Sequence, residues 1–171
     1  MHVFLQGPLG IGKSTVIRKT LALLTADKNI RIGGFFTRKG GSGDPHIYIQ
    51  AANPGGAADA YRFADYDGDN VVCYPEVFDR EGVRLLKDAV TADIICMDEL
   101  GFLERGSTLF QAQVLSCLDG NIPILGVLRE GDIAWHDAIK AHPSVAIFEV
   151  SAANRNALPE MLVGELGRSK L

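Results

Sequence analysis

The stretch of sequence that decides the fold is Gly7-Pro8-Leu9-Gly10-Ile11-Gly12-Lys13-Ser14. It matches the pattern G-x-x-x-x-G-K-[S/T], which average composition would produce by chance in roughly one in a hundred chains of this size or fewer. Glycines let the backbone curl around an anion without a Cβ clash. Backbone N–H groups at the start of a helix then point at that anion, where the helix dipole also favours negative charge. The stretch therefore predicts a phosphate-binding loop.

The flanks of this loop have the required context, a strand before it and a helix after it. The apolar run at residues 3–5 indicates a buried strand. Residues 13–26 carry a one-sided apolar pattern that is typical of a helix. We expect Lys13 to meet the β- and γ-phosphates and Ser14 to offer its hydroxyl to Mg²⁺. The residues assigned to nucleotide binding here are Gly7, Pro8, Leu9, Gly10, Ile11, Gly12, Lys13, Ser14 and Thr15.

The rest of the chain alternates strand patterns with helical ones. Strands are expected at 30–37, 93–98, 122–127 and 145–150, and helices at 75–89, 107–118, 134–141 and 156–167. Strands that alternate with helices predict a mostly parallel sheet covered on both faces, which is a three-layer α/β fold. The length of 171 residues suits a single domain over residues 1–171.

Residues 39–73 interrupt this alternation with a different pattern. Turn clusters stand at residues 39–45 and 53–56, and residues 46–50 alternate between polar and apolar side chains. Residues 61–63 are a further short strand candidate. Such a pattern predicts a small antiparallel insertion at one edge of the sheet.

Composition and charge exclude several classes of protein. The net charge is −4 and the pI is about 5.5, so the basic stripe of a protein that binds long nucleic acids is not expected. No apolar run approaches the roughly 20 residues of a membrane span. The three cysteines are far apart and odd in number, which argues against a disulfide framework and fits a reducing cytoplasm. The histidines lack metal-ligand spacing, and we expect Trp135 to be a packing residue. We expect a cytoplasmic monomer.

An acidic pair, Asp98-Glu99, ends the apolar strand predicted at 93–98. A carboxylate there lies at the carboxyl edge of the sheet, where ligands of open α/β sheets bind. Asp98 is the expected Mg²⁺ partner. Glu99 can polarise a water for attack on the γ-phosphate, which favours hydrolysis over transfer to an acceptor. The alternative for Glu99 is a surface acid at the strand exit. The pair is often found with the parallel strand order 5-1-4-3-2.

With these elements in place, the chain resembles the small P-loop nucleoside-triphosphatases, whose members include a human cancer-related nucleoside-triphosphatase and thermophilic bacterial and archaeal proteins. The resemblance implies a RecA-like sheet, Mg²⁺ dependence, slow turnover and loose base choice. It also implies that Lys13 and Ser14 hold phosphate and metal, that Asp98 holds metal and that Glu99 is the base. Phe102 departs from the pattern, because some relatives have a basic residue there. The resemblance depends on His2-Val3-Phe4-Leu5 with the loop, Gly34-Phe35-Phe36-Thr37, Met97-Asp98-Glu99-Leu100-Gly101, Glu104, Val150-Ser151 and Asn154-Arg155-Asn156.

Asn154 and Arg155 follow the last predicted strand, where the base or ribose lies in such folds. We include both among the nucleotide-binding residues, since an arginine there can stack on a purine. Asn154 equally suits the N-cap of the last helix.

Phosphoryl chemistry usually needs extra positive charge on the γ-phosphate. Arg38 and Arg129 both follow predicted strands, and either is a candidate for an arginine finger from within the chain. The alternative is a solvated surface arginine in each case. We place Arg129 among the catalytic residues with Glu99 and Lys13.

Three functions follow from these residues. The first is Mg²⁺-dependent hydrolysis of nucleoside 5′-triphosphates such as ATP and GTP. The second is a small-molecule or nucleotide kinase, although the insertion is poor in the arginines of an acceptor lid. The third is a nucleotide-gated binding module whose partner surface includes the aromatic residues of the insertion and its approach. Those aromatics are Phe35, Phe36, Tyr48 and Tyr61.

Overall fold

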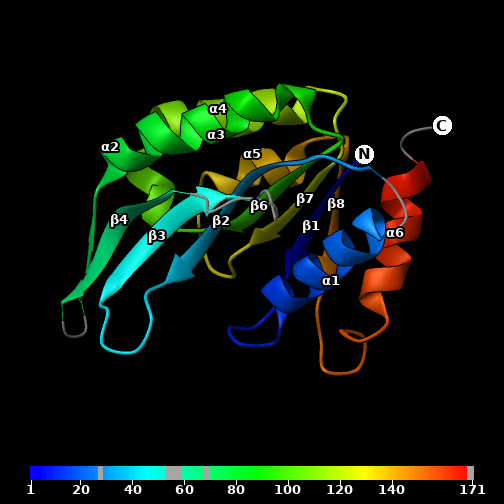
Figure 1. Ribbon diagram of the computed structural model, residues 1–171, viewed down its shortest axis with the longest axis horizontal. Coiled ribbons are helices and arrows are strands. Elements are labelled where there is room, and N and C mark those ends of the chain that lie inside the picture. Colours follow the sequence, from blue (N-terminus) through cyan, green and yellow to red (C-terminus); the bar gives the residue numbers. More distant parts are fainter. Residues whose placement is uncertain (27–28, 53–58, 68–69, 169–171) are drawn as a thin grey trace.

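A mixed eight-stranded sheet forms the centre of the molecule in a computed structural model, which describes residues 1–26, 29–52, 59–67 and 70–168 (Figure 1). The strand order is β5-β4-β3-β2-β6-β7-β1-β8. The strands are β1 (His2–Gln6), β2 (Ile32–Lys39), β3 (His46–Ala51), β4 (Ala60–Asp67), β5 (Asn70–Cys73), β6 (Ile94–Leu100), β7 (Ile124–Leu128) and β8 (Val145–Glu149).

The parallel part of the sheet confirms the expected arrangement. Strands β2, β6, β7, β1 and β8 pair in parallel with their neighbours. Numbered along the chain, these five strands have the order 5-1-4-3-2, with β7 inserted between the loop-bearing β1 and the acid-bearing β6. The carboxyl ends of all five strands consequently meet at one edge, where the chemistry of an open α/β sheet is located.

Helices cover both faces of the sheet, as expected for three layers (Figure 1). Helices α1 and α6 lie together on one face, while α3, α4 and α5 lie on the other. The predicted helix at 75–89 is split by a π-helical turn into several pieces. The helical elements are α1 (Lys13–Thr25), α2 (Pro75–Val77), the π turn η1 (Phe78–Gly82), α3 (Val83–Asp88), the 3₁₀ turns η2 (Ala89–Thr91) and η3 (Leu103–Gly106), α4 (Thr108–Leu118), α5 (His136–Ala141) and α6 (Leu158–Arg168). None of the helices in the described ranges is both long and apolar enough to cross a bilayer.

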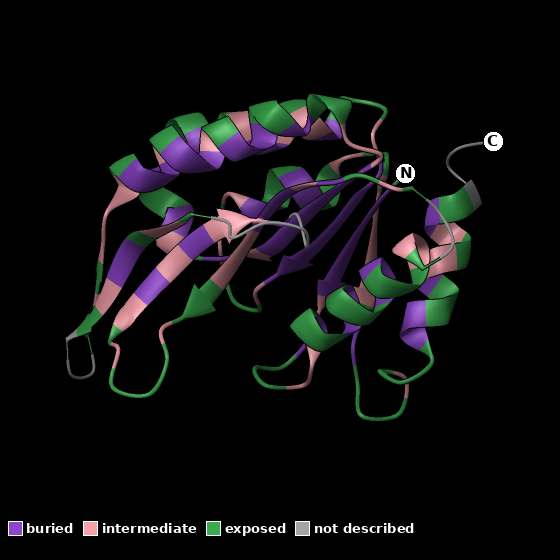
Figure 2. Ribbon diagram, in the orientation of Figure 1, coloured by how far each residue is buried: buried purple, intermediate pink, exposed green. Residues whose placement is uncertain are grey.

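The core consists of two apolar layers, one on each face of the sheet (Figure 2). Strand β1 contributes to both, because successive side chains alternate between faces. Phe4 joins the layer beneath α3 and α4, whereas Val3 and Leu5 join the layer beneath α1 and α6. Phe35 is fully buried in the first layer, so it belongs to the core and not to a partner surface.

The antiparallel insertion extends the sheet beyond β2, as predicted, but it contains a longer β4 and one more strand, β5, than the sequence indicated. The first half of β2 pairs with β6 and its second half pairs with β3, so β2 continues to Lys39. Strand β4 is longer than the predicted 61–63, and β5 was not predicted at all, because four residues without alternation give no strand signal. The turn cluster expected at 53–56 lies outside the described residues.

Candidate active site

Residues 7–12 wrap closely around the start of α1. Gly7, Gly10 and Gly12 have φ angles of 145°, 77° and 108°, values that L side chains rarely adopt. At Gly7 a Cβ would also lie 2.6 Å from the carbonyl oxygen of Val150, so the loop touches the chain that leaves β8. Helix α1 begins at Lys13, directly after Gly12, so the loop leads into a helix N-terminus of the kind that binds anions.

Lys13 supplies the positive charge of this loop. Its side chain is buried, and its ammonium donates to the carbonyl oxygens of Gly7 at 2.5 Å and Pro8 at 3.1 Å. These bonds hold the ammonium against the loop, where it adds to the helix dipole. Ser14 and Thr15, by contrast, are exposed at the start of the helix.

Ser14 and Asp98 come together from opposite sides of the site. The Ser14 hydroxyl donates to Asp98 Oδ1 at 3.1 Å, and Asp98 is only 2% exposed. Burial raises the pKa of Asp98 to about 6, with the hydrogen bond from Ser14 opposing the shift and the charge of Glu99 adding to it. Because this hydrogen bond joins residues 84 positions apart in the sequence, the loop and the end of β6 form one site.

The two oxygen donors fit Mg²⁺ but do not enclose it. A hydroxyl and a carboxylate are hard ligands of the kind that Mg²⁺ prefers, and Mg²⁺ commonly keeps several waters and takes further oxygens from substrate phosphates. Within the described ranges there is no cluster of three or more His, Cys, Asp or Glu side chains that could hold a metal by itself. Any Mg²⁺ held by Ser14 and Asp98 would therefore depend on the nucleotide for the rest of its ligands.

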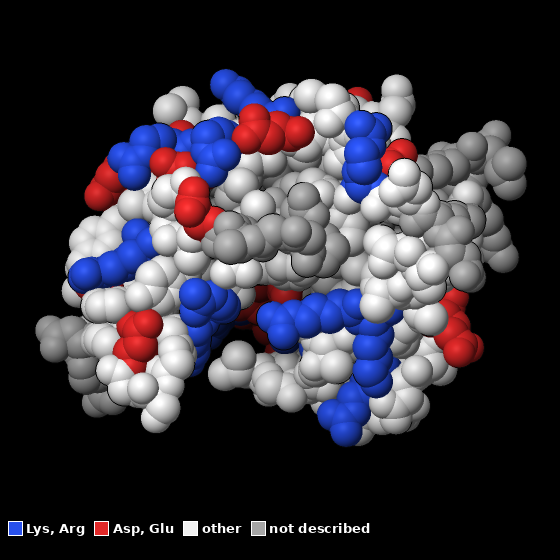
Figure 3. Space-filling view, in the orientation of Figure 1, with Lys and Arg blue, Asp and Glu red and all other residues white. Residues whose placement is uncertain are grey.

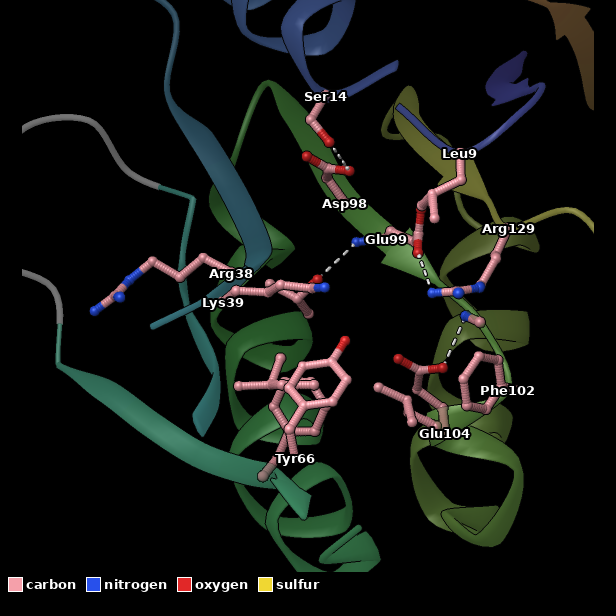
Figure 4. Close-up of a pocket in the computed structure, with 15 residues that line it drawn as sticks. Leu9, Ser14, Arg38, Lys39, Tyr66, Asp98, Glu99, Phe102, Glu104 and Arg129 are labelled. Atoms are coloured by element: carbon pink, nitrogen blue, oxygen red, sulfur yellow. Dashed lines mark hydrogen bonds and ion pairs between the residues drawn. The ribbon is translucent and has the colours of Figure 1, made fainter. Parts of the chain in front are cut away.

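Glu99 and Arg129 are neighbours in the structure (Figure 4). Arg129 Nη1 lies 3.4 Å from Glu99 Oε1, and its guanidinium stacks on the Phe102 ring at 4.7 Å from the centroid. The backbone N–H of Glu99 points at Thr37 Oγ1, at 3.3 Å. Two residues that the sequence marked independently, the base and one arginine, thus form an ion pair at the carboxyl edge of the sheet.

A cleft of about 170 Å³ opens in front of Ser14, Asp98 and Glu99. Figure 3 shows acidic atoms deep in a hollow that is flanked by lysine and arginine side chains. Part of the wall comes from the insertion, for which the sequence predicted no catalytic role. The insertion and its approach contribute Lys39, Ile47, Phe63 and Tyr66 to the lining.

Arg38 and Lys39 are adjacent on β2 but point in opposite directions (Figure 4). The Arg38 side chain leaves the cleft, donates from Nε to Gln50 Oε1 at 2.9 Å and stacks on Tyr48 at 4.8 Å. Lys39 enters the cleft, with its ammonium 4.7 Å from the centroid of the Tyr66 ring. Period-two alternation along a strand accounts for this difference, and it could have been inferred if β2 had been extended past Thr37.

The turn after Glu99 is held by residues farther along the chain. Gly101 N–H donates to Glu104 Oε2 at 2.7 Å, and the Trp135 indole donates to the Gly101 carbonyl at 3.0 Å. Burial raises the pKa of Glu104 to about 7, although the hydrogen bond from Gly101 works against this shift. Trp135 therefore does more than pack, since its N–H anchors the segment that carries Glu99.

Of the late pair Asn154 and Arg155, Arg155 contacts the phosphate loop and Asn154 is held within its own segment. The Asn154 amide is engaged within its own segment, accepting from Ser151 N–H and donating to the Glu149 carbonyl, both at 2.8 Å. Its side chain does not cap α6, which begins at Leu158. Arg155 Nη1 donates to the Ile11 carbonyl at 3.2 Å, so the Arg155 side chain packs against the phosphate loop. Contact of either residue with a base stays a prediction.

The chain is similar to known proteins over most of its length. A protein family described as NTPase has a model that matches residues 2–163. The chain belongs to the NTPase family. Relatives of this chain in the family include the nucleoside-triphosphatase THEP1 of Thermofilum pendens. It is 31% identical over 173 residues, covering 96% of this chain and 94% of that protein. The THEP1 protein of Thermotoga maritima is 29% identical over 163 residues, covering 92% and 91%.

Two solved structures share the fold of this NTPase-family chain. The solution structure of a human cancer-related nucleoside triphosphatase has a TM-score of 0.81 at 23% identity, covering 98% of each chain. The crystal structure of THEP1 from Aquifex aeolicus has a TM-score of 0.79 at 19% identity, covering 97% of this chain and 99% of the other. At these identities the likeness establishes the α/β P-loop fold, which confirms the expected fold class.

Proposed function

We propose that this protein hydrolyses nucleoside 5′-triphosphates to the diphosphate and phosphate, with Mg²⁺ as cofactor. The observation that carries the proposal is the hydrogen bond between Ser14 and Asp98, which joins the phosphate loop to the acidic pair. Family membership and the names of the THEP1 relatives point to the same activity.

The loop would bind the phosphates through backbone N–H groups at the start of α1 and through the Lys13 ammonium. Ser14 and Asp98 would hold Mg²⁺ together with phosphate oxygens. When bound, Mg²⁺ neutralises the charge that develops on the β- and γ-phosphates. Because Lys13 is already fixed against the loop carbonyls, little reordering is needed to receive a phosphate.

Glu99 would act as the base. Its carboxylate takes a proton from a water as the water oxygen bonds to the γ-phosphorus and the bond from that phosphorus to the β–γ bridging oxygen breaks. The electron pair of the broken bond stays on the diphosphate. Arg129, which is paired with Glu99, would orient the carboxylate and add positive charge on the side of the reacting phosphate.

Loose base choice is part of the proposal. The Asn154 amide is held by Ser151 and Glu149, which limits how it can turn to read the edge of a base. Arg155 offers a planar cation that would stack on any purine or pyrimidine.

Phosphate release from ATP, GTP, CTP and UTP, with Mg²⁺ and with EDTA, tests the activity. Glu99→Gln keeps the shape of the side chain and removes the base, so we expect kcat to fall by roughly 10²-fold or more while ATP still binds. A Glu99→Gln variant with the parental rate would show that another group activates the water. Lys13→Ala should instead weaken nucleotide binding.

The cleft also favours a second candidate, a kinase, because the insertion forms a wall beside the position of the γ-phosphate. A pocket there has room for a small hydroxyl acceptor. ADP formation with and without nucleosides, nucleotides or sugars separates the two functions. If ADP forms only when an acceptor is present, the protein is a kinase and the proposal of hydrolysis is wrong.

A further inference from the structure

Three of the described residues at the cleft, Arg38, Lys39 and Arg129, are cationic, and their side chains point in different directions. Arg38 turns away to Gln50 and Tyr48. Arg129 is paired with the carboxylate of Glu99, which already offsets much of its charge. Lys39 points into the cleft, between the acidic pair on one side and Tyr66 on the other (Figure 4).

The surroundings of Lys39 leave its charge available. Among the side chains that the structure describes, no carboxylate lies within ion-pair distance of the Lys39 ammonium, which contacts the Tyr66 ring at 4.7 Å from the centroid. An aromatic face holds an ammonium by its quadrupole and does not neutralise it. Lys39 is therefore positioned as a cation that faces an anion site.

Strand geometry explains how Lys39 comes to line the cleft. Phe36 on β2 pairs with Asp98 on β6, and Lys39 follows three residues later, about 10 Å farther along the strand. Lys39 also pairs with Ile47 on β3, so its backbone is held on the sheet. From there the lysine side chain projects into the cleft, and Figure 4 shows it between the acidic pair and Tyr66.

We propose that Lys39 is a further catalytic residue, the cation that contacts the terminal phosphate from the insertion side. This inference rests on the proposed hydrolysis and deepens it. Charge in the transition state spreads over the three equatorial oxygens of the transferred phosphoryl group. Lys13 approaches that group from the loop and Lys39 approaches it across the cleft, so the insertion supplies part of the catalytic site.

The decisive variant is Lys39→Met, which keeps the length of the side chain and removes the charge. With Mg²⁺ and saturating ATP we expect kcat to fall roughly 10- to 100-fold. ADP lacks the terminal phosphate, so its affinity should stay within about two-fold of the parental value. Lys39→Arg should recover part of the rate, and Tyr66→Leu should lose part of it, because the ammonium then lacks its platform. Circular dichroism and Tm report whether each variant is folded.

Lys87→Met serves as the charge-matched control. Lys87 is an exposed cation on α3 outside the cleft, so its variant should keep the parental kcat. A folded Lys39→Met variant with the parental kcat overturns the inference, and so does an equal loss of affinity for ADP and ATP. A loss of rate in Arg38→Met without one in Lys39→Met would identify the other cation.

Failure of hydrolysis itself would be seen separately. In that case neither the parent nor Lys87→Met would release phosphate. The affinities of the parent and of Lys39→Met for ADP and for a non-hydrolysable ATP analogue would then be compared. If Lys39 meets the terminal phosphate, Lys39→Met lowers the preference for the triphosphate. An unchanged preference would overturn the inference even for a protein that does not hydrolyse ATP.

Discussion

At the scale of the residue, the site combines side chains that the loop motif implies with others that only contacts identify. Lys13 and Ser14 occupy the places that their motif positions suggest. Glu104 was marked by the resemblance alone, yet it is 2% exposed and accepts the N–H of Gly101. A carboxyl group buried this deeply must influence how stability changes with pH.

Glu104→Gln tests that influence. Burial in the folded protein raises the pKa of Glu104 from 4.5 to about 7. The protonated group therefore adds its full contribution to the free energy of unfolding below about pH 4.5. This contribution is lost as the pH rises through 7. Glutamine keeps an acceptor for Gly101 but cannot ionise. We expect the free energy of unfolding of the variant, relative to the parent, to increase from pH 5 to pH 8 by at most about 3 kcal/mol.

Urea unfolding at pH 5, 6, 7 and 8 measures this difference. An equal difference between variant and parent at every pH would mean that Glu104 does not titrate in this range.

At the scale of the element, the pairing of β2 with β6 decides whether the two halves of the site meet. Gly34 has a φ of 89°, and a Cβ there would collide with the Cys96 carbonyl oxygen on β6. Close approach of these strands places Thr37 beside Glu99 and continues β2 toward the cleft. The glycine is therefore needed for both backbone conformation and strand contact.

Gly34→Ala should destabilise the protein by about 2–4 kcal/mol, since it adds a left-handed backbone penalty to a backbone clash. Gly41→Ala is the matched control, because a Cβ at Gly41 has no described atom within 4 Å. Thermal and urea unfolding of both variants give the comparison. Similar stabilities for the two would remove the role assigned to Gly34.

At the scale of the whole molecule, the site joins the loop, the end of β6, the end of β7 and the insertion, which are far apart in the chain. A ligand that touches several of these elements should stabilise the fold as a unit. At a concentration of 100 times Kd a ligand contributes about 2.7 kcal/mol, which corresponds to roughly 5–10 °C in Tm for a chain of this size.

We expect that increase with a non-hydrolysable ATP analogue and Mg²⁺, and a smaller one with EDTA, because Ser14 and Asp98 alone do not complete a metal site. Lys13→Ala should abolish the increase. Leu109→Ala, on the exposed side of α4, should retain it. Differential scanning fluorimetry provides the measurement. A rise in Tm that is the same with EDTA and in the Lys13→Ala variant would show that the nucleotide binds elsewhere.

The sequence by itself determined the phosphate loop, the alternation of strands and helices, and the acidic pair. These features depend on local spacing and on apolar periodicity, which are properties of neighbouring residues. Only the tertiary structure decided that Arg129 pairs with Glu99, that Trp135 and Glu104 hold the turn at Gly101, and that Arg38 leaves the cleft while Lys39 enters it. Those outcomes depend on which strand lies beside which and on where β2 ends, and long-range pairing sets both.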